Sequence, residues 1–328
     1  MLEHGGRLRA AAARYHIPLA DWLDLSTGIN PSGWPVPDVP AGLWRQLPEA
    51  NDGLEAAAQG YYGVTETLPV AGSQAAIQAL PRLRRPSRVA VLEPGYAEHA
   101  EAWRLAGHQV LPLAAEAVRS ASAPPADVVV LIHPNNPTGA RFAHTTLLDW
   151  QERLAARGGW LVVDEAFIDT MPGDSLAADC PRSGLIVLRS LGKFFGLAGA
   201  RIGFVIAEPR LNAALGALLG PWTLTNPARW VAQRALADRA WQAAARVHLA
   251  QGARRLAALL CQHRLSPAGG CALFQWVRTP DASDLHTLLA RQGILTRLFD
   301  TPPSLRFGLP GDEPGWTRLA AALASARD

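Results

Sequence analysis

The chain has 328 residues, of which 49% are hydrophobic and 18% charged, so it can bury a large core, and its length predicts about two domains. Its net charge is only +3 and no run of Lys or Arg exceeds two residues, which argues against a nucleic-acid-binding protein. The three cysteines, Cys180, Cys261 and Cys271, give neither a disulfide framework nor a metal-binding spacing, and no apolar run is long enough to span a membrane. We therefore expect a cytoplasmic protein without a metal site.

Three regions follow one another along the chain. Residues 1–45 are rich in proline and glycine, and we expect an N-terminal arm that packs on the small domain and the active site. Residues 46–215 alternate short apolar runs with helical stretches, which is typical of an α/β domain with a mostly parallel sheet covered on both faces. Residues 216–328 predict a smaller C-terminal α+β domain.

The elements expected in the large domain are six strands and several helices between them. The strands are Val89–Leu92, Val110–Leu113, Val128–Ile132, Trp160–Val163, Leu185–Leu188 and Ile202–Ile206, and the helices are Gln74–Leu83, Ala97–Ala106 and Thr145–Ala156. In the small domain we expect a long helical region over Asn226–Cys261, an alternating segment Cys271–Val277, a helix near Asp284–Gln292 and the segment Ile294–Phe307.

A lysine, a serine and an arginine stand close together after the apolar run that ends at Leu188. They are Ser190, Lys193 and Arg201, in the sequence SLGKFFGLAGAR. A single lysine in a glycine-containing loop is most often a surface residue, but the ends of parallel strands are where active sites gather. An amine can form an imine with an aldehyde, whereas a hydroxyl and a guanidinium can bind a phosphate. Pyridoxal 5′-phosphate carries both an aldehyde and a phosphate.

A carboxylate follows another apolar strand, at Asp164 in LVVDEAF. Such a group at the strand end can hold a protonated pyridine nitrogen, and the resulting charge makes the cofactor ring an electron sink. The alternative interpretation is an ordinary helix N-cap.

Two turns complete the motif set. His133–Gly139, with the sequence HPNNPTG, places Asn136 where its amide could donate to an oxygen on the ring, although it could also be a plain structured loop. Gly72 and Ser73 precede a helical run and could form a second side of a phosphate cup, although a simple N-cap has the same appearance.

Taken together, these motifs resemble the fold-type I pyridoxal-phosphate enzymes of the class I/II aminotransferase family, over nearly the whole chain. Within that family the chain is most similar to the branch that decarboxylates O-phospho-L-threonine in cobalamin biosynthesis, which is itself similar to the histidinol-phosphate aminotransferases. The narrower match rests on four segments: His4-Gly5-Gly6, Asp24–Pro31, Glu93–His99 and Asp164–Asp169.

The resemblance implies a role for each matching residue around the cofactor. Lys193 would form the imine, Asp164 would pair with the ring nitrogen, Asn136 would donate to the ring 3′-oxygen and Tyr96 would stack on the ring. The cofactor phosphate would be bound by Gly72, Ser73, Ser190 and Arg201. A tyrosine from the partner subunit of a homodimer would join them; the match falls on Tyr61, with Tyr62 left open.

The substrate residues implied by the resemblance lie near the two ends of the chain. Arg306 would bind the substrate carboxylate and Arg297 its phosphate, with His4 and Asn30 reaching the same pocket from the arm. Each of these residues also has a non-functional interpretation: the arginines as surface residues, the histidine as a solvated side chain and the asparagine as part of an Asx turn. Phe167 departs from the tyrosine that many aminotransferases carry at this position, so it cannot donate to the 3′-oxygen.

We therefore expect pyridoxal-phosphate-dependent decarboxylation of O-phospho-L-threonine to (R)-1-aminopropan-2-ol O-phosphate, in a homodimer with shared active sites. The bond at Cα that breaks is the one perpendicular to the ring, so the groups that hold the substrate select the reaction. One alternative is a histidinol-phosphate-type aminotransferase. The other is a non-catalytic ligand-sensing domain, which is disfavoured because Lys193, Asp164 and Arg201 are all present.

Overall fold

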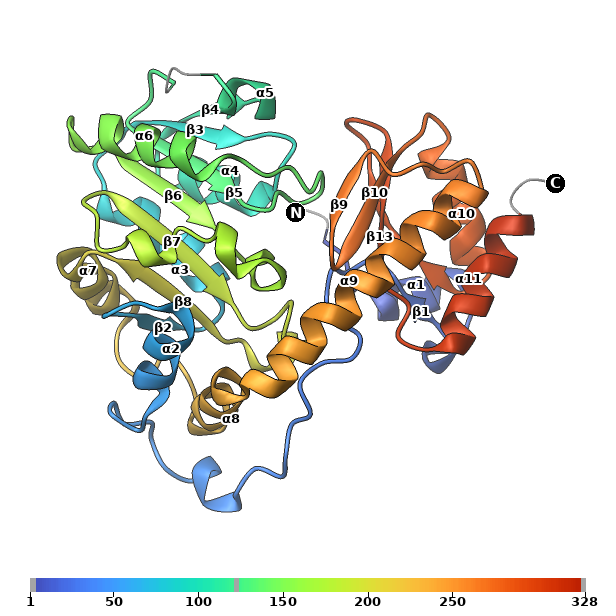
Figure 1. Ribbon diagram of the computed structural model, residues 1–328, viewed down its shortest axis with the longest axis horizontal. Helices are drawn as coiled ribbons and strands as arrows, with labels where there is room; N and C mark the ends of the chain where they lie inside the picture. Colours follow the sequence, from blue (N-terminus) through green and yellow to red (C-terminus); the bar gives the residue numbers. More distant parts are fainter. Residues whose placement is uncertain (1–3, 121–123, 326–328) are drawn as a thin grey trace. The chain divides into compact units, whose positions relative to one another are not determined.

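The computed structural model of the chain describes residues 4–120 and 124–325. They divide into two compact units, and each is described by itself (Figure 1). The central unit comprises residues 33–136 and 140–243, and the terminal unit comprises the residues up to 32, 137–139 and those from 244 onward. The domain boundaries expected after residues 45 and 215 stay a prediction.

The central unit is built on a seven-stranded sheet with the strand order β2-β8-β7-β6-β5-β3-β4. Its strands are β2 (Leu68–Val70), β3 (Arg88–Leu92), β4 (Gln109–Leu113), β5 (Val128–Ile132), β6 (Trp160–Asp164), β7 (Leu185–Ser190) and β8 (Gly203–Ala207). Strand β8 is antiparallel to both of its neighbours, and the remaining pairs are parallel. The predicted α/β fold with a mostly parallel sheet is therefore confirmed.

Helices cover both faces of this sheet because its central strands are apolar on both sides. Buried residues of α3, α4 and α7 form one core with strands of the sheet, and α6 covers the opposite face (Figure 1). The helices are α2 (Leu54–Tyr62), α3 (Ser73–Ala79), α4 (Ala97–Leu105), α5 (Ala115–Val118), α6 (His144–Ala155), α7 (Pro209–Leu219) and α8 (Asn226–Ala237). Short 3₁₀ turns are η2 (Ala41–Trp44), η3 (Leu80–Leu83), η4 (Ile168–Thr170), η5 (Pro172–Asp174), η6 (Ala177–Asp179) and η7 (Ala198–Ala200).

The long helical region predicted from residue 226 is two helices that meet at Asp238. The side chain of Asp238 accepts a hydrogen bond from the backbone N–H of Trp241 at 3.0 Å and another from Trp34 Nε1 at 3.0 Å. An aspartate that caps the following helix in this way satisfies donors left open at its start. The sequence periodicity alone did not reveal this break.

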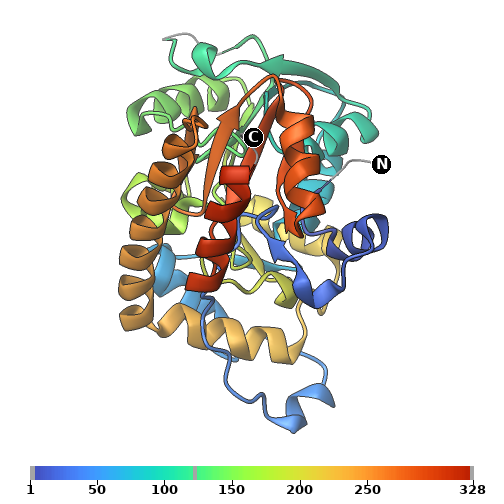
Figure 2. The ribbon, with the colours of Figure 1, turned by 90° about the vertical axis from the view of Figure 1, so that its right-hand side faces the viewer.

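The terminal unit contains a four-stranded antiparallel sheet of order β12-β13-β10-β9 and a parallel pair, β1 with β11. Figure 2 looks onto α9 and α11 of this unit. Its elements are α1 (Leu8–Tyr15), η1 (Leu19–Asp21), β1 (Leu23–Asp24), α9 (Arg239–Gln262, in this unit from residue 244), β9 (Gly269–Cys271), β10 (Phe274–Arg278), α10 (Ala282–Arg291), β11 (Ile294–Leu295), β12 (Arg297–Phe299), β13 (Ser304–Gly308) and α11 (Glu313–Ser325). Among the described residues, no helix combines the length and the apolar character needed to cross a bilayer.

Candidate active site

Asp164 is the last residue of β6, and it is 3% exposed. Its Oδ2 lies 2.9 Å from Nε2 of the buried His99, and its Oδ1 accepts the backbone N–H of Ala166 at 3.0 Å. The carboxylate is therefore held on both oxygens. His99, on α4, was not assigned a role from the sequence, because nothing in the linear pattern of Glu93–His99 shows which way that side chain points.

Tyr96 lies directly before α4, next to the same histidine. Its hydroxyl donates to Oε1 of Gln74 at 3.1 Å, and its ring meets the His99 ring edge-on with centroids 6.2 Å apart. Burial, together with the nearby Glu98 and Asp164 carboxylates, raises the pKa of Tyr96 to about 12. The phenol thus stays protonated at neutral pH and offers an aromatic face.

The turn that carries Asn136 starts beside Asp164, because the strands before them are neighbours in register. The backbone N–H of His133 donates to the carbonyl of Asp164 at 2.8 Å. Asn135 then braces the turn, with its N–H on the Ala140 carbonyl at 2.9 Å and its Nδ2 on the Pro94 carbonyl at 2.8 Å. The structure thus places Asn136, which is half-buried, on the turn that starts at this edge of the sheet.

The four residues predicted to bind a phosphate converge around β8. Gly203 on β8 pairs in register with Ser190 on β7, and a Cβ added at Gly203 would lie 2.6 Å from the backbone nitrogen of Ser73. A Cβ added at Gly72 would lie 2.8 Å from Nη2 of Arg201, and the backbone φ of +71° at Gly72 also favours glycine. The result is a small cradle with a hydroxyl, a guanidinium and backbone N–H groups.

Lys193 lies in the turn after β7 and is half-buried. Its Nζ is 5.6 Å from the ring centroid of Phe167, which belongs to the turn that follows Asp164. The lysine and the aspartate predicted to contact opposite parts of one cofactor ring therefore stand on adjacent turns. An amine, a carboxylate, an aromatic face and a cradle that a Cβ would fill match the groups of pyridoxal 5′-phosphate.

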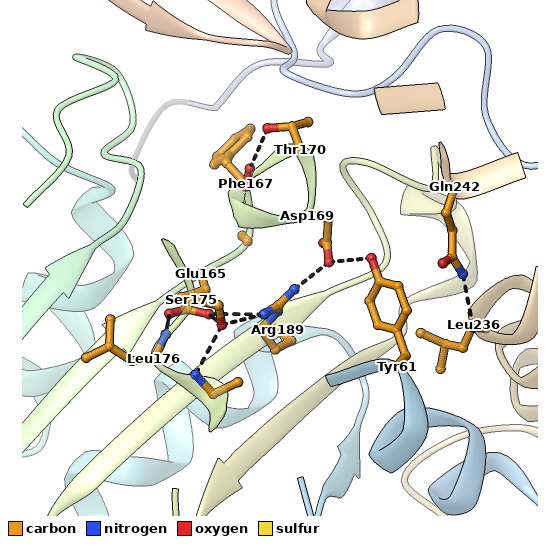
Figure 3. Close-up of polar contacts among 12 residues, drawn as sticks. Tyr61, Glu165, Phe167, Asp169, Thr170, Ser175, Leu176, Arg189, Leu236 and Gln242 are labelled. Atoms are coloured by element: carbon orange, nitrogen blue, oxygen red, sulfur yellow. Dashed lines mark hydrogen bonds and ion pairs between the residues drawn. The ribbon is translucent and has the colours of Figure 1, made fainter. Parts of the chain in front are cut away.

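The two neighbouring tyrosines of α2 differ in their surroundings. The Tyr61 hydroxyl donates to Oδ1 of Asp169 at 2.9 Å (Figure 3). Tyr62 is 8% exposed, its ring lies 4.5 Å from the guanidinium carbon of Arg189, and burial raises the pKa of its hydroxyl. A core position makes Tyr62 a poor group to reach a second subunit, so Tyr61 stays the predicted residue for the shared phosphate site.

The terminal unit carries the two arginines predicted to bind the substrate. Arg297 on β12 and Arg306 on β13 are directly paired in register, which puts both side chains on one face of the sheet. Arg306 is 6% exposed and donates to the Ser26 carbonyl at 2.7 Å. Burial and the neighbouring Arg297 lower the pKa of Arg306 to about 10, so the Arg306 guanidinium stays charged at neutral pH.

Arg297 and His4 line one cavity of about 520 Å³ in the terminal unit. The other charged or titratable side chains at its wall are Arg7, Arg14, Tyr15, His286 and Asp300, so cations outnumber the one carboxylate. Asn30 is not among the described residues of this wall. It is 3% exposed, and its Oδ1 accepts a hydrogen bond from the N–H of Ser32 at 2.9 Å. This contact is the Asx turn that was the alternative interpretation of Asn30.

Comparisons with known proteins agree with this arrangement. Residues 48–326 match the family profile described as "Aminotransferase class I and II". The chain is 58% identical to a threonine-phosphate decarboxylase of Pseudomonas aeruginosa, over 100% of this chain and 99% of that protein, and 43% identical to one of a Sinorhizobium species, over 98% of both. Its fold is similar, with a TM-score of 0.85 and 19% identity, to a histidinol-phosphate aminotransferase of Sinorhizobium meliloti in complex with pyridoxal 5′-phosphate, covering 99% of this chain and 96% of that one.

Proposed function

This chain belongs to the class I and II aminotransferase family, and from that membership we propose that it decarboxylates O-phospho-L-threonine to (R)-1-aminopropan-2-ol O-phosphate with pyridoxal 5′-phosphate. The observation that carries the proposal is the 58% identity to a threonine-phosphate decarboxylase over the whole chain. A histidinol-phosphate aminotransferase of Mycobacterium tuberculosis is 32% identical over 96% of this chain, which is lower than the 58% and 43% identity of the two decarboxylases.

The central unit supplies the groups for the cofactor. When bound, pyridoxal 5′-phosphate withdraws electrons from the Cα of an amino acid joined to it. Asp164, braced by His99 at 2.9 Å, would hold a proton at the ring nitrogen, and Lys193 would provide the amine for the aldehyde. Asn136 would donate to the ring 3′-oxygen, and Phe167 could not share this role because it carries no donor.

The phosphate of the cofactor goes to the cradle around β8. Ser190 and Arg201 contribute a hydroxyl and a guanidinium, and Gly72 and Ser73 approach them closely enough to add backbone N–H groups. Tyr96 provides the aromatic face for the ring. Lys193 would hold a proton at its Nζ and would act as the general acid that delivers it to Cα after loss of carbon dioxide.

The terminal unit supplies the groups for the substrate anions. The cavity lined by Arg297 and His4 suits a phosphate dianion, because its wall is strongly cationic. Arg306 is the candidate for the substrate carboxylate, since a planar guanidinium binds carboxylates through two parallel hydrogen bonds. Anchoring both anions fixes rotation about the Cα–N bond, and the anchoring thereby selects the bond to the carboxylate for cleavage.

The decisive assay uses purified protein, pyridoxal 5′-phosphate and O-phospho-L-threonine. We expect release of carbon dioxide without any 2-oxo acid, and no release by Lys193→Ala under the same conditions. Turnover that depends on 2-oxoglutarate, or turnover of histidinol phosphate in place of phosphothreonine, would contradict the proposal.

The proposal extends to assembly and setting. Several large apolar side chains of the central unit are strongly exposed, among them Trp44 at 68%, Leu47 at 63% and Trp222 at 60%, which supports a homodimer in which Tyr61 completes the partner's phosphate site. Light scattering of the purified protein tests the dimer. A cytoplasmic location and a role in cobalamin biosynthesis belong to the same proposal, and loss of cobalamin synthesis after deletion of the gene would support that role.

A further inference from the structure

An arginine lies almost fully buried between two carboxylates at the carboxyl edge of the central sheet. Arg189 on β7 is 2% exposed, Glu165 is 0% exposed and Asp169 is 1% exposed (Figure 3). One arm of the guanidinium, Nη1, donates to Oε2 of Glu165 at 3.1 Å, and the other arm, Nη2, donates to Oδ1 of Asp169. A single planar group thus joins two separate points of the turn that follows β6.

Further hydrogen bonds fix both carboxylates. The hydroxyl of Ser175 donates to Glu165 at 2.5 Å and the N–H of Leu176 donates to it at 2.7 Å, whereas Asp169 accepts the hydroxyl of Tyr61 at 2.9 Å. The network therefore connects the turn after β6, the end of β7 and helix α2. Such geometry leaves little freedom to the guanidinium and the two carboxylates.

Stability alone is a weak reason for this network. Burying ions carries a desolvation cost that their attraction often does not exceed, and packed apolar side chains of similar volume serve as well or better. Here two carboxylates share one guanidinium, and burial raises the pKa of Glu165. An arrangement with this desolvation cost is better explained by the fixed directions of its hydrogen bonds than by its effect on stability.

The network stands next to the candidate cofactor residues on both sides. Glu165 directly follows Asp164, and Arg189 directly precedes Ser190 on the way to Lys193. The ladder between β6 and β7 ends here, with Asp164 opposite Leu188 and the N–H of Glu165 on the Leu188 carbonyl at 2.9 Å. Beyond this point β6 ends and β7 pairs only with β8 up to Ser190, and the ion pairs of Arg189 continue the connection between β7 and the turn after β6.

We propose that Arg189 is a positioning residue for the cofactor, which sets the turn bearing Asp164 relative to the Ser190–Lys193 loop through its two-armed contact with Glu165 and Asp169. The inference rests only on the cofactor part of the proposed function. Its two arms must point to two different carboxylates, so lysine, which has one compact ammonium group, cannot replace arginine here.

The test compares Arg189→Lys with the wild-type protein. Apoprotein is titrated with pyridoxal 5′-phosphate, and the visible band of the bound cofactor is followed against pH. We expect cofactor binding at least about tenfold weaker and a displaced midpoint of the pH titration, because Lys193 and Asp164 no longer keep their spacing. The control is Arg182→Lys, which removes the guanidinium of an exposed ion pair with Glu152 and should behave as wild type.

Two isosteric variants cover the case in which Arg189→Lys does not fold. Glu165→Gln and Asp169→Asn keep size and shape while each removes one charge, and we expect at least one to weaken cofactor binding by about threefold or more. Wild-type cofactor affinity and an unchanged pH midpoint in every folded variant, with only the melting temperature lowered, would overturn the proposal. These measurements use no substrate, so their outcome is independent of whether the reaction is decarboxylation or transamination.

Discussion

The candidate cofactor residues of the central unit and the candidate anion residues of the terminal unit are built in different ways. Asp164, Ser190 and Lys193 lie at or just after the ends of buried strands whose register is fixed by the sheet. Arg297 lies on the edge strand β12, and the cavity it lines is closed partly by exposed side chains of α1. The difference indicates that covalent chemistry requires residues held in fixed positions, whereas binding an anion requires mainly a high density of positive charge. Variants should therefore separate the two functions.

The largest effect is expected for Lys193→Ala. Without the amine, activity should fall by about a thousandfold or more, and borohydride should no longer attach the cofactor to the protein. The same variant should still bind O-phospho-L-threonine, measured by calorimetry, because the terminal unit is unchanged. Loss of both properties together would remove the contrast between the two units.

Arg297→Gln should give the opposite pattern. Removing a charge-assisted contact to a phosphate costs about 1.5–3 kcal/mol, which lowers kcat/KM by about 10- to 150-fold, while the affinity for pyridoxal 5′-phosphate stays at the wild-type value. Arg278→Gln is the matched control, an exposed arginine on β10 of the same sheet. Equal losses in both variants would show that general surface charge, and not this cavity, attracts the substrate.

The central unit should also be the more sensitive of the two to acid. Burial lowers the pKa of His133, which is 1% exposed, to about 4, whereas the unfolded chain has an ordinary value near about 6.5. The unfolded state therefore binds more protons between these values, and stability is complete above them and falls as the pH drops. Through His133, we expect the free energy of unfolding to fall by about 2 kcal/mol between pH 7 and pH 5. Urea unfolding at the two pH values measures this loss, and His133→Asn should reduce it.

The smallest effect is expected for Tyr96→Phe. The aromatic face remains and only the hydrogen bond to Gln74 is lost, so kcat should change by less than about tenfold. Because the pKa of Tyr96 is raised to about 12, its ionisation should leave no inflection in the activity profile of the wild-type protein below pH 10. An inflection near pH 9 that disappears in the variant would show a more active part for the phenol.

Strands of the central sheet were the part of the molecule that the sequence predicted best. All six predicted strands are present, and β5 has the predicted bounds Val128–Ile132, because buried parallel strands read as uninterrupted apolar runs. β2, which contains a proline within three residues, and helices α1, α2, α7 and α11 were not predicted. Short or Ala-rich segments have a weak apolar pattern, so their secondary structure could not be predicted in this way.

Side-chain directions were the part that the sequence could not reveal. Arg189 stands in the run LIVLRS, where an arginine would be expected to face solvent, yet it is buried against Glu165 and Asp169. His99 and the cationic wall formed by α1 and β12 depend likewise on tertiary contacts between distant segments. Motifs predicted candidate residues for the chemistry, whereas the contacts that hold these residues in place could not be predicted from the sequence.

The cross-strand pairing of Arg297 with Arg306 has a consequence for handling the protein. Two like charges on one face repel each other, so any small inorganic oxyanion that settles between or beside them relieves that repulsion and favours the folded chain. At a concentration one hundred times its dissociation constant, such an ion adds about 2.7 kcal/mol of stability. Melting curves recorded in sulfate or phosphate buffer should therefore lie above those in chloride of equal ionic strength, and assays in phosphate buffer will understate the true affinity for substrate.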